Sequence, residues 1–220
     1  MKRFWRENGL SCVLFALFVV FLVGQALTGW REEVNDLLDH GRAPITLLEY
    51  VASGSLLEAT MENWESEFLQ MAAYLIFTVF LFQRGSAESK DPDKEEAVDR
   101  DPRLSRNKPD VPGPVRAGGW RLWIYERSLG FTLIALFLLS FVLHGVGGAS
   151  AYNEQSVLHD GPTITVLQYM MSARFWFESF QNWQSEFLSI GAMVVLSVFL
   201  RQRGSPESKP VDSPHHSTGE

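Results

Sequence analysis

The fold is decided by residues 63–90, NWESEFLQMAAYLIFTVFLFQRGSAESK, which recur with substitutions at residues 182–209 as NWQSEFLSIGAMVVLSVFLRQRGSPESK. Each copy places an apolar run after an Asn-Trp pair and ends it at Gln-Arg-Gly. We predict that each copy is one helix, entering a membrane at the Asn-Trp end and leaving it at the Gln-Arg-Gly end.

The similarity extends beyond these segments at one offset, 183 minus 64, or 119 residues, without a gap. Gly29, His40 and Tyr50 correspond in this way to Gly148, His159 and Tyr169. Similarity at one fixed period over a whole half of a chain indicates a duplicated unit. We therefore predict two copies of one module, at residues 1–84 and 120–203.

Four segments are apolar enough to lie in a membrane: Leu10–Leu27, Phe68–Phe82, Leu129–Val146 and Phe187–Leu200. A soluble four-helix bundle is the alternative, but it requires a polar face on every helix. The first and third segments have none. We predict an all-α protein of two parallel two-helix repeats with helical outer loops, whose transmembrane helices lie at about 10–28, 66–84, 129–147 and 185–202.

The first apolar segment follows Lys2, Arg3 and Arg6, as in a cleavable secretion signal. Its counterpart in the second module is internal, and an internal segment cannot be a signal peptide. We therefore predict an uncleaved membrane anchor.

Basic residues predict the orientation in the membrane. They collect at the N-terminus, between Arg84 and Arg127, and in the tail, whereas the two long inter-helix loops carry only Arg31, Arg42 and Arg174. Positively charged loops stay in the cytoplasm. We predict cytoplasmic termini, a multi-pass protein of the cell (inner) membrane, and a symmetry axis along the membrane normal.

Charged residues and prolines fill the linker, residues 85–119, and a similar composition marks the tail, residues 204–220. We expect both to be disordered. In the first outer loop, PITLLEYVAS predicts a short helix, and Ser55 with Glu58 forms a possible capping box for a helix from Ser55 to Arg84.

A polar stripe follows one face of each repeated helix, because its residues are three or four positions apart. In a membrane this face should turn toward protein or water. One hypothesis makes Glu67 and Glu186 paired carboxylates for a cation or proton; the other makes the stripe a polar helix start and a packing surface. The stripe comprises Asn63, Glu67, Gln70, Tyr74 and Thr78, and in the second copy Asn182, Glu186, Ser189, Met193 and Ser197.

Other polar and aromatic residues allow more than one interpretation. Gln25 and His144 occupy equivalent positions, where a histidine can titrate or pack. His40 and His159, beside Asp39 and Asp160, suit either a metal site or helix caps. Trp64 and Trp183 are predicted interface anchors.

Several functions are excluded or unsupported. A net charge of -7 argues against a nucleic-acid partner, and the single cysteine, Cys12, allows no disulfide within the chain. We find no nucleophile, base and orienting group at a recognisable spacing, so we predict no enzyme, no cofactor and no metal.

With its ENWESEFLQ and QRGSAESK motifs and its two-helix modules, the chain resembles a family of bacterial integral membrane proteins that is defined as a domain of unknown function. The resemblance implies a bacterial inner-membrane location and supplies no functional residues. The second copy departs from the motif, since Gln181 and Gln184 replace Glu62 and Glu65. Any site that uses these acids would be asymmetric.

These observations leave two functional hypotheses. The first is a non-enzymatic membrane protein whose partners are the lipid bilayer, further copies of itself or another membrane protein. The second is a small channel or transporter that uses the Glu67 and Glu186 helix faces.

Overall fold

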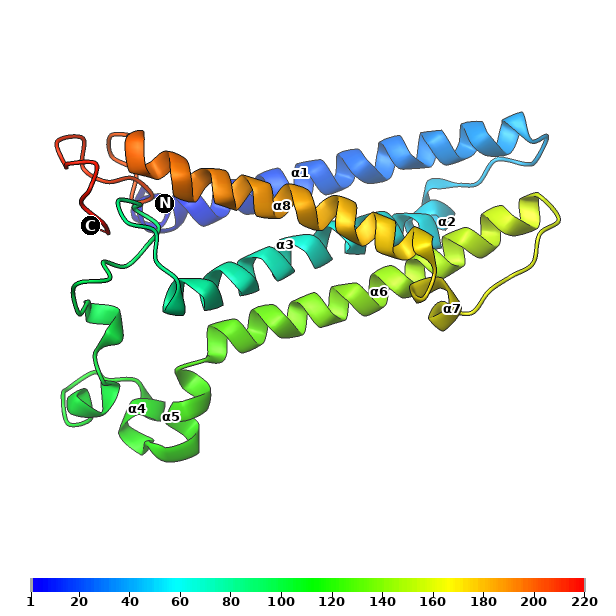
Figure 1. Cartoon of the computed structure of the whole chain (residues 1–220). Helices are drawn as coiled ribbons and strands as arrows, with labels where there is room; N and C mark the ends of the chain where they lie inside the picture. The colour runs from blue at the N-terminus through cyan, green and yellow to red at the C-terminus, as the bar shows by residue number, and fades with distance from the viewer. Residues whose placement is uncertain (1, 220) are drawn as a thin grey trace. The chain divides into compact units, whose positions relative to one another are not determined.

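The computed structural model describes residues 2–219, which form helices and contain no strand (Figure 1). The prediction of an all-α chain is confirmed. In order, the helices are α1 (Lys2–Asp39), α2 (Leu47–Val51), α3 (Gly54–Phe80), η1 (Ala97–Asp99), η2 (Pro102–Ser105), α4 (Gly113–Ala117), α5 (Gly119–Tyr125), α6 (Ser128–Leu158), α7 (Val166–Met170) and α8 (Ala173–Phe199).

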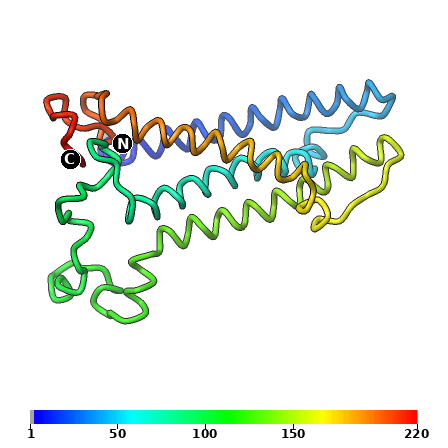
Figure 2. The backbone as a smooth tube through the Cα atoms, in the orientation of Figure 1, coloured from blue at the N-terminus to red at the C-terminus, as the bar shows by residue number. Residues whose placement is uncertain are grey.

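The helix bounds recur along the chain. Adding 119 to the bounds of α2 and α3 gives those of α7 and α8, and adding 119 to the end of α1 gives the end of α6. Figure 2 shows the chain turning back after α1 and again after α6. Equivalent local sequences therefore start and stop helices at equivalent places.

The chain divides into two compact units. The first unit contains residues 1–61 and 142–175, and the second contains residues 62–141 and 176–220. The division falls inside α3, α6 and α8, so each unit holds part of these three helices.

Capping boxes start the short helices α2 and α7 in the first unit. The Thr46 hydroxyl accepts a hydrogen bond from the Glu49 amide, while the Glu49 carboxylate accepts one from the Thr46 amide. Thr165 and Gln168 repeat the arrangement at α7. Each box provides acceptors for backbone N–H groups that have no partner within the helix at its start.

The start of α3 differs from our prediction in its capping residue. The hydroxyl of Ser53, rather than Ser55, accepts from a first-turn amide, that of Leu56, at 3.4 Å. Ser172 does the same for Phe175 at the start of α8. Because the helix begins one residue earlier than predicted, the Glu58 side chain is available for another contact.

Glycines allow close packing in the first unit. A Cβ at Gly29 would overlap the Tyr50 hydroxyl, and one at Gly148 would overlap the Tyr169 ring. Gly147 of α6 lies against the Glu58 backbone of α3, where a Cβ would be 2.5 Å from the Glu58 nitrogen. Small residues of this kind let helices approach closely.

The helix α3 ends at Phe80, before the predicted end at Arg84. The Gln83 amide donates to the Ser89 hydroxyl rather than to a helical carbonyl, and Gly85 has φ 86°. The second copy behaves alike, because the Gln202 amide donates to Ser208 and Gly204 has φ 85°. The QRGS sequences therefore form a folded turn after the helix.

The linker contains the short helices η1, η2 and α4, and the tail forms successive turns. Local hydrogen bonds hold these segments, such as the 2.6 Å contact of Lys90 with Asp99. The disorder of residues 85–119 and 204–220 stays a prediction.

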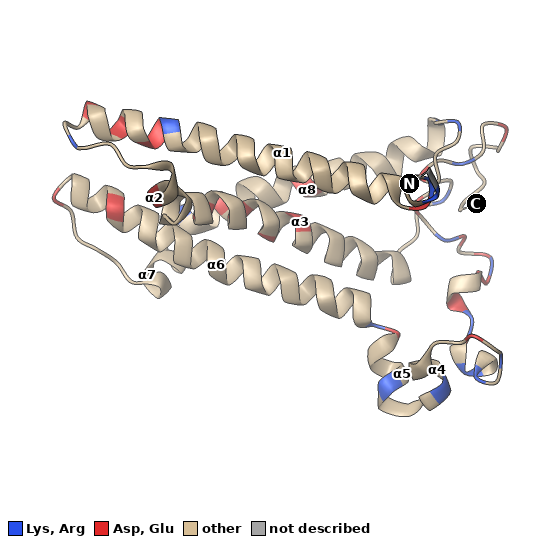
Figure 3. Cartoon of the chain, turned by 180° about the vertical axis from the view of Figure 1, so that it is seen from behind, with Lys and Arg blue, Asp and Glu red and all other residues tan. Residues whose placement is uncertain are grey.

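Among the described helices, α1 and α6 are long and apolar enough to cross a membrane. Charged residues are absent from their middle portions, between Glu7 and Arg31 and between Arg127 and Glu154 (Figure 3). The first halves of α3 and α8 carry charged residues, which shortens their apolar runs.

Candidate functional site

A buried polar layer joins α3 and α8 in the second unit. Glu65 of α3 is fully buried, and its carboxylate accepts a hydrogen bond of 2.9 Å from the indole nitrogen of Trp183. One turn earlier, the Asn182 amide donates to the Glu62 carboxylate. A buried carboxylate requires such donors, because its desolvation is otherwise costly.

Aromatic rings surround the Trp183 side of this layer. Ring centroids of Phe137, Trp176 and Phe180 lie 6.3, 6.2 and 5.6 Å from that of Trp183, in edge-to-face arrangements. Edge-to-face pairs of this kind add to the packing energy. Trp183, predicted as an interface anchor, thus also packs within the protein, whereas Trp64 is 36% exposed beside Phe68.

The predicted polar stripe is not one continuous buried face. Asn63, Glu67 and Ser189 are exposed, and Gln70, Asn182 and Glu186 are half-buried. The Thr78 hydroxyl donates to the Leu75 carbonyl of its own helix. The buried acid Glu65 and the half-buried acid Glu62 make the contacts to α8. Glutamines replace both acids in the second copy, and this difference is the sequence signal that could have singled them out.

Two later residues of the stripe, Tyr74 and Ser197, contact the linker. The Tyr74 hydroxyl donates to the Glu88 carboxylate at 3.0 Å, and the buried hydroxyls of Ser86 and Ser197 lie 2.7 Å apart. These contacts bind the QRGS turn of the first copy to both α3 and α8.

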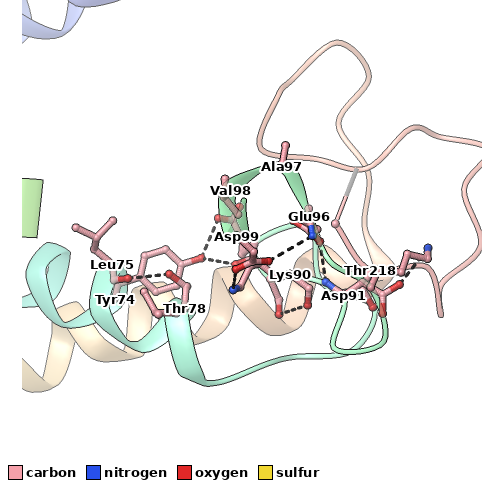
Figure 4. Close-up of a pocket in the computed structure, with 16 residues that line it drawn as sticks. Tyr74, Leu75, Thr78, Lys90, Asp91, Glu96, Ala97, Val98, Asp99 and Thr218 are labelled. Carbon is pink, nitrogen blue, oxygen red and sulfur yellow. Dashed lines mark hydrogen bonds and ion pairs between the residues drawn. The ribbon is translucent and has the colours of Figure 1, made fainter. Parts of the chain in front are cut away.

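A cavity of about 850 Å³ lies beside Tyr74 (Figure 4). Lys90 and Asp99, both at its wall, form an ion pair, and this hydrogen bond lowers the pKa of Asp99. Lys94 pairs with Asp91 at 3.1 Å. Glu88 and Glu96 also line the cavity, so its acidic side chains outnumber its two lysines.

Lys209 binds the tail to the QRGS turn that follows α3. Its ammonium donates to the carbonyl oxygens of Gly85, Pro214, His215 and Ser217, and the residue is 2% exposed. Burial, with a contribution from Arg201, lowers the pKa of Lys209, while the carbonyl oxygens solvate its charged form. This lysine belongs to the ESK sequence that follows QRGS in both copies.

The first unit holds a second polar centre, around Glu58. Its carboxylate accepts a hydrogen bond of 2.7 Å from the Tyr169 hydroxyl and lies 3.9 Å from the Arg174 guanidinium. A ring nitrogen of His144 is within 4.8 Å of it, and this fully buried imidazole stacks on Phe175. Sequence reasoning singled out His144 but missed its neighbours Glu58, Tyr169 and Arg174.

Glu58 and Arg174 also line an acidic cavity of about 150 Å³. Glu33 and Asp36 of α1 and Glu154 of α6 supply further carboxylates. With four carboxylates and one guanidinium, this part of the first unit attracts cations.

The remaining predicted residues have different environments. Gln25 is half-buried on α1, although its counterpart His144 is fully buried. His40 and His159 are exposed, and their ring centroids lie 5.3 Å apart. The structure thus brings together the two histidines that the sequence suggested as a possible metal site.

Comparisons with known proteins give the family of the chain. Neither the curated proteins nor the solved structures contain a match. A family described as a domain of unknown function (DUF6766) matches residues 1–220. The chain therefore belongs to the family called domain of unknown function DUF6766.

Proposed function

We propose that this protein is a non-enzymatic, four-pass protein of the bacterial inner membrane that assembles with further copies of itself through α1. Two modules threaded in the same direction would each cross the membrane twice, which leaves both termini in the cytoplasm. The recurrence of the helix bounds at 119 residues supports this duplicated arrangement.

The observation that carries the proposal is the exposure of α1. Eleven large apolar side chains between Leu10 and Leu27 are each at least 40% exposed. If these side chains stayed in water, the protein would lose hydrophobic stabilisation on the order of 10 kcal/mol, because full burial of one such side chain contributes about 1.5–3 kcal/mol. That figure is comparable with the whole stability of a domain, about 5–15 kcal/mol. The helix therefore requires lipid or protein on nearly every side.

The contrast with α6 favours a protein partner on part of this surface. None of the most apolar 18 residues of α1 is buried, against 22% of those of α6. A membrane helix whose most apolar part is not buried by its own chain can pack against another chain, and such packing uses van der Waals contact between helices.

The polar layer supports assembly over transport. Glu65 is enclosed and bound by Trp183, which suits a packed interior, and Glu67 is exposed. A cation pathway would instead require hydrated carboxylates along a continuous channel.

Cysteine cross-linking tests the proposed interface. In a Cys12→Ser background, single cysteines at Val13, Phe15, Val19 and Phe21 are exposed to an oxidant in native membranes. Cross-links that recur with helical periodicity would support an α1 interface, and Val211→Cys in the exposed tail is the control. Uniform or absent cross-linking, together with a monomeric mass in nanodiscs, would overturn the proposal.

Proteoliposome flux distinguishes the transport alternative. We expect no cation or proton flux above that of empty liposomes. Flux that disappears in both Glu67→Gln and Glu186→Gln would establish transport instead. A reporter placed after Lys108 should report a cytoplasmic position, and one placed after Arg42 an extracytoplasmic position.

A further inference from the structure

His40 and His159 come from corresponding loop starts of the first unit, each directly after a long helix. His40 follows α1 and His159 follows α6, at positions separated by 119 residues. Their ring centroids are 5.3 Å apart, with an interplanar angle of 78°. Both rings are exposed, so solvent ions reach them.

The hydrogen bonds fix the tautomer of both rings. His40 Nδ1 lies 2.8 Å from the Asp36 carbonyl oxygen, and His159 Nδ1 lies 3.0 Å from the Gln155 carbonyl oxygen. A carbonyl only accepts hydrogen bonds, so each Nδ1 carries the hydrogen. In the neutral rings, each Nε2 therefore keeps its lone pair, as in histidines that ligate metals.

The separation of the rings suits one shared ion. Two imidazoles that bind one Zn²⁺ through Zn–N bonds of about 2.1 Å, at a tetrahedral angle, have ring centres about 5 Å apart. The observed 5.3 Å agrees with this value. The remaining ligand positions would hold water, since the pair lies at the protein surface.

Two nearby features favour a cation. The Asp36 carboxylate lies 3.6 Å from His40 Nδ1, and an outer carboxylate of this kind raises the basicity of a ligating imidazole. Asp36 also lines the acidic cavity with Glu33 and Glu154, which raises the local cation concentration.

We propose that His40 and His159 together bind one divalent transition-metal ion, such as Zn²⁺, and so link the two modules at their loops. Imidazole is a preferred ligand of Zn²⁺, Ni²⁺ and Cu²⁺, and Cu²⁺ binds most tightly among these ions. The site is independent of the proposed assembly through α1, because its two ligands belong to one chain.

The test is calorimetric titration of the untagged full chain, in detergent micelles, with Zn²⁺. We expect one Zn²⁺ per chain. His40→Ala and His159→Ala should each lower the affinity for Zn²⁺ by at least about 10-fold, because loss of a residue that only hydrogen-bonds to a metal ligand already lowers metal affinity by about 10- to 100-fold. Asp36→Asn should weaken binding by about 10-fold. His216→Ala, in the exposed tail, is the matched control and should bind as the wild type does.

Several outcomes would overturn the site: no saturable binding, equal affinity in the wild type and in both single variants, or one Zn²⁺ per two chains. If an alanine variant fails to fold, His40→Gln and His159→Gln replace it. Bound Cu²⁺ provides a second readout, since its electron paramagnetic resonance spectrum should report two nitrogen ligands in the wild type and one in His159→Ala. One nitrogen in the wild type would contradict the proposal.

Discussion

Trp183 donates its indole N–H to the carboxylate of Glu65, and this hydrogen bond of 2.9 Å joins α8 to a fully buried acid of α3. The acid is not kept in the other copy, because Gln184 stands at the position of Glu65. The counterpart of Trp183 is Trp64, which is 36% exposed. The two copies of the module have therefore diverged at the acid.

Removal of this donor should destabilise the protein. We expect Trp183→Phe to lower the free energy of unfolding by about 1–3 kcal/mol, because a buried carboxylate loses a hydrogen-bond partner. Thermal unfolding in detergent measures the change. Trp120→Phe, at a ring that is 70% exposed, should change stability by less than about 0.5 kcal/mol. Equal effects of the two substitutions would contradict a specific role for the Trp183 bond.

The glycine beneath Tyr169 should not tolerate a side chain. Gly148→Ala places a Cβ in the space of the Tyr169 ring, and we expect a loss of about 1–3 kcal/mol from overpacking. Gly191→Ala is the matched control on α8, since no atom outside its own helix backbone lies within 4 Å of the added Cβ. This control should stabilise its helix by about 0.5–1 kcal/mol. Loss of stability in both variants would point to a general intolerance of the helices.

Acid should weaken the cap of α2 but not that of α7. Hydrogen bonds from the backbone and side chain of Thr46 lower the pKa of Glu49 below its ordinary 4.5. A depressed carboxyl pKa stabilises the folded state above the unfolded pKa, and this stabilisation is lost as the pH falls through the folded pKa. Gln168 occupies the same position at α7 and does not titrate.

Hydrogen exchange measures this difference between the caps. After correction for intrinsic rates, protection of residues 46–52 should fall below pH 4.5, while that of residues 165–171 stays constant. Glu49→Gln should remove the pH dependence of the first segment. A parallel loss in both segments would show that acid unfolds the whole loop end of the first unit rather than one cap.

Lys209 should protect the tail from proteolysis. Lys209→Met removes the ammonium that four carbonyl oxygens surround, so a protease should cleave residues 210–219 several-fold faster than in the wild type. Lys94→Met, at an exposed side chain, is the control. If the wild-type tail is cleaved as fast as the variant tail, the sequence-based prediction of a disordered tail holds instead.

The sequence by itself determined the helical class and the recurrence at 119 residues, whereas the helices extend beyond the predicted segments: α1, for example, runs from Lys2 to Asp39. Apolar runs, capping residues and glycines act over a few neighbouring positions, so equivalent sequences give equivalent helix ends. The resemblance carried by the ENWESEFLQ and QRGSAESK motifs also led to the correct family.

Only the tertiary structure decided which polar residues meet. Helical spacing placed Glu67 on the same face as Asn63, but spacing cannot tell which face a neighbouring helix covers, and the structure buries Glu65 instead. The Ser55 and Glu58 pattern is a genuine local signal, yet Ser53 begins the helix and Tyr169, 111 residues away, takes the Glu58 carboxylate. Contacts between distant segments depend on how helices pack, and that information is absent from the local pattern of residues.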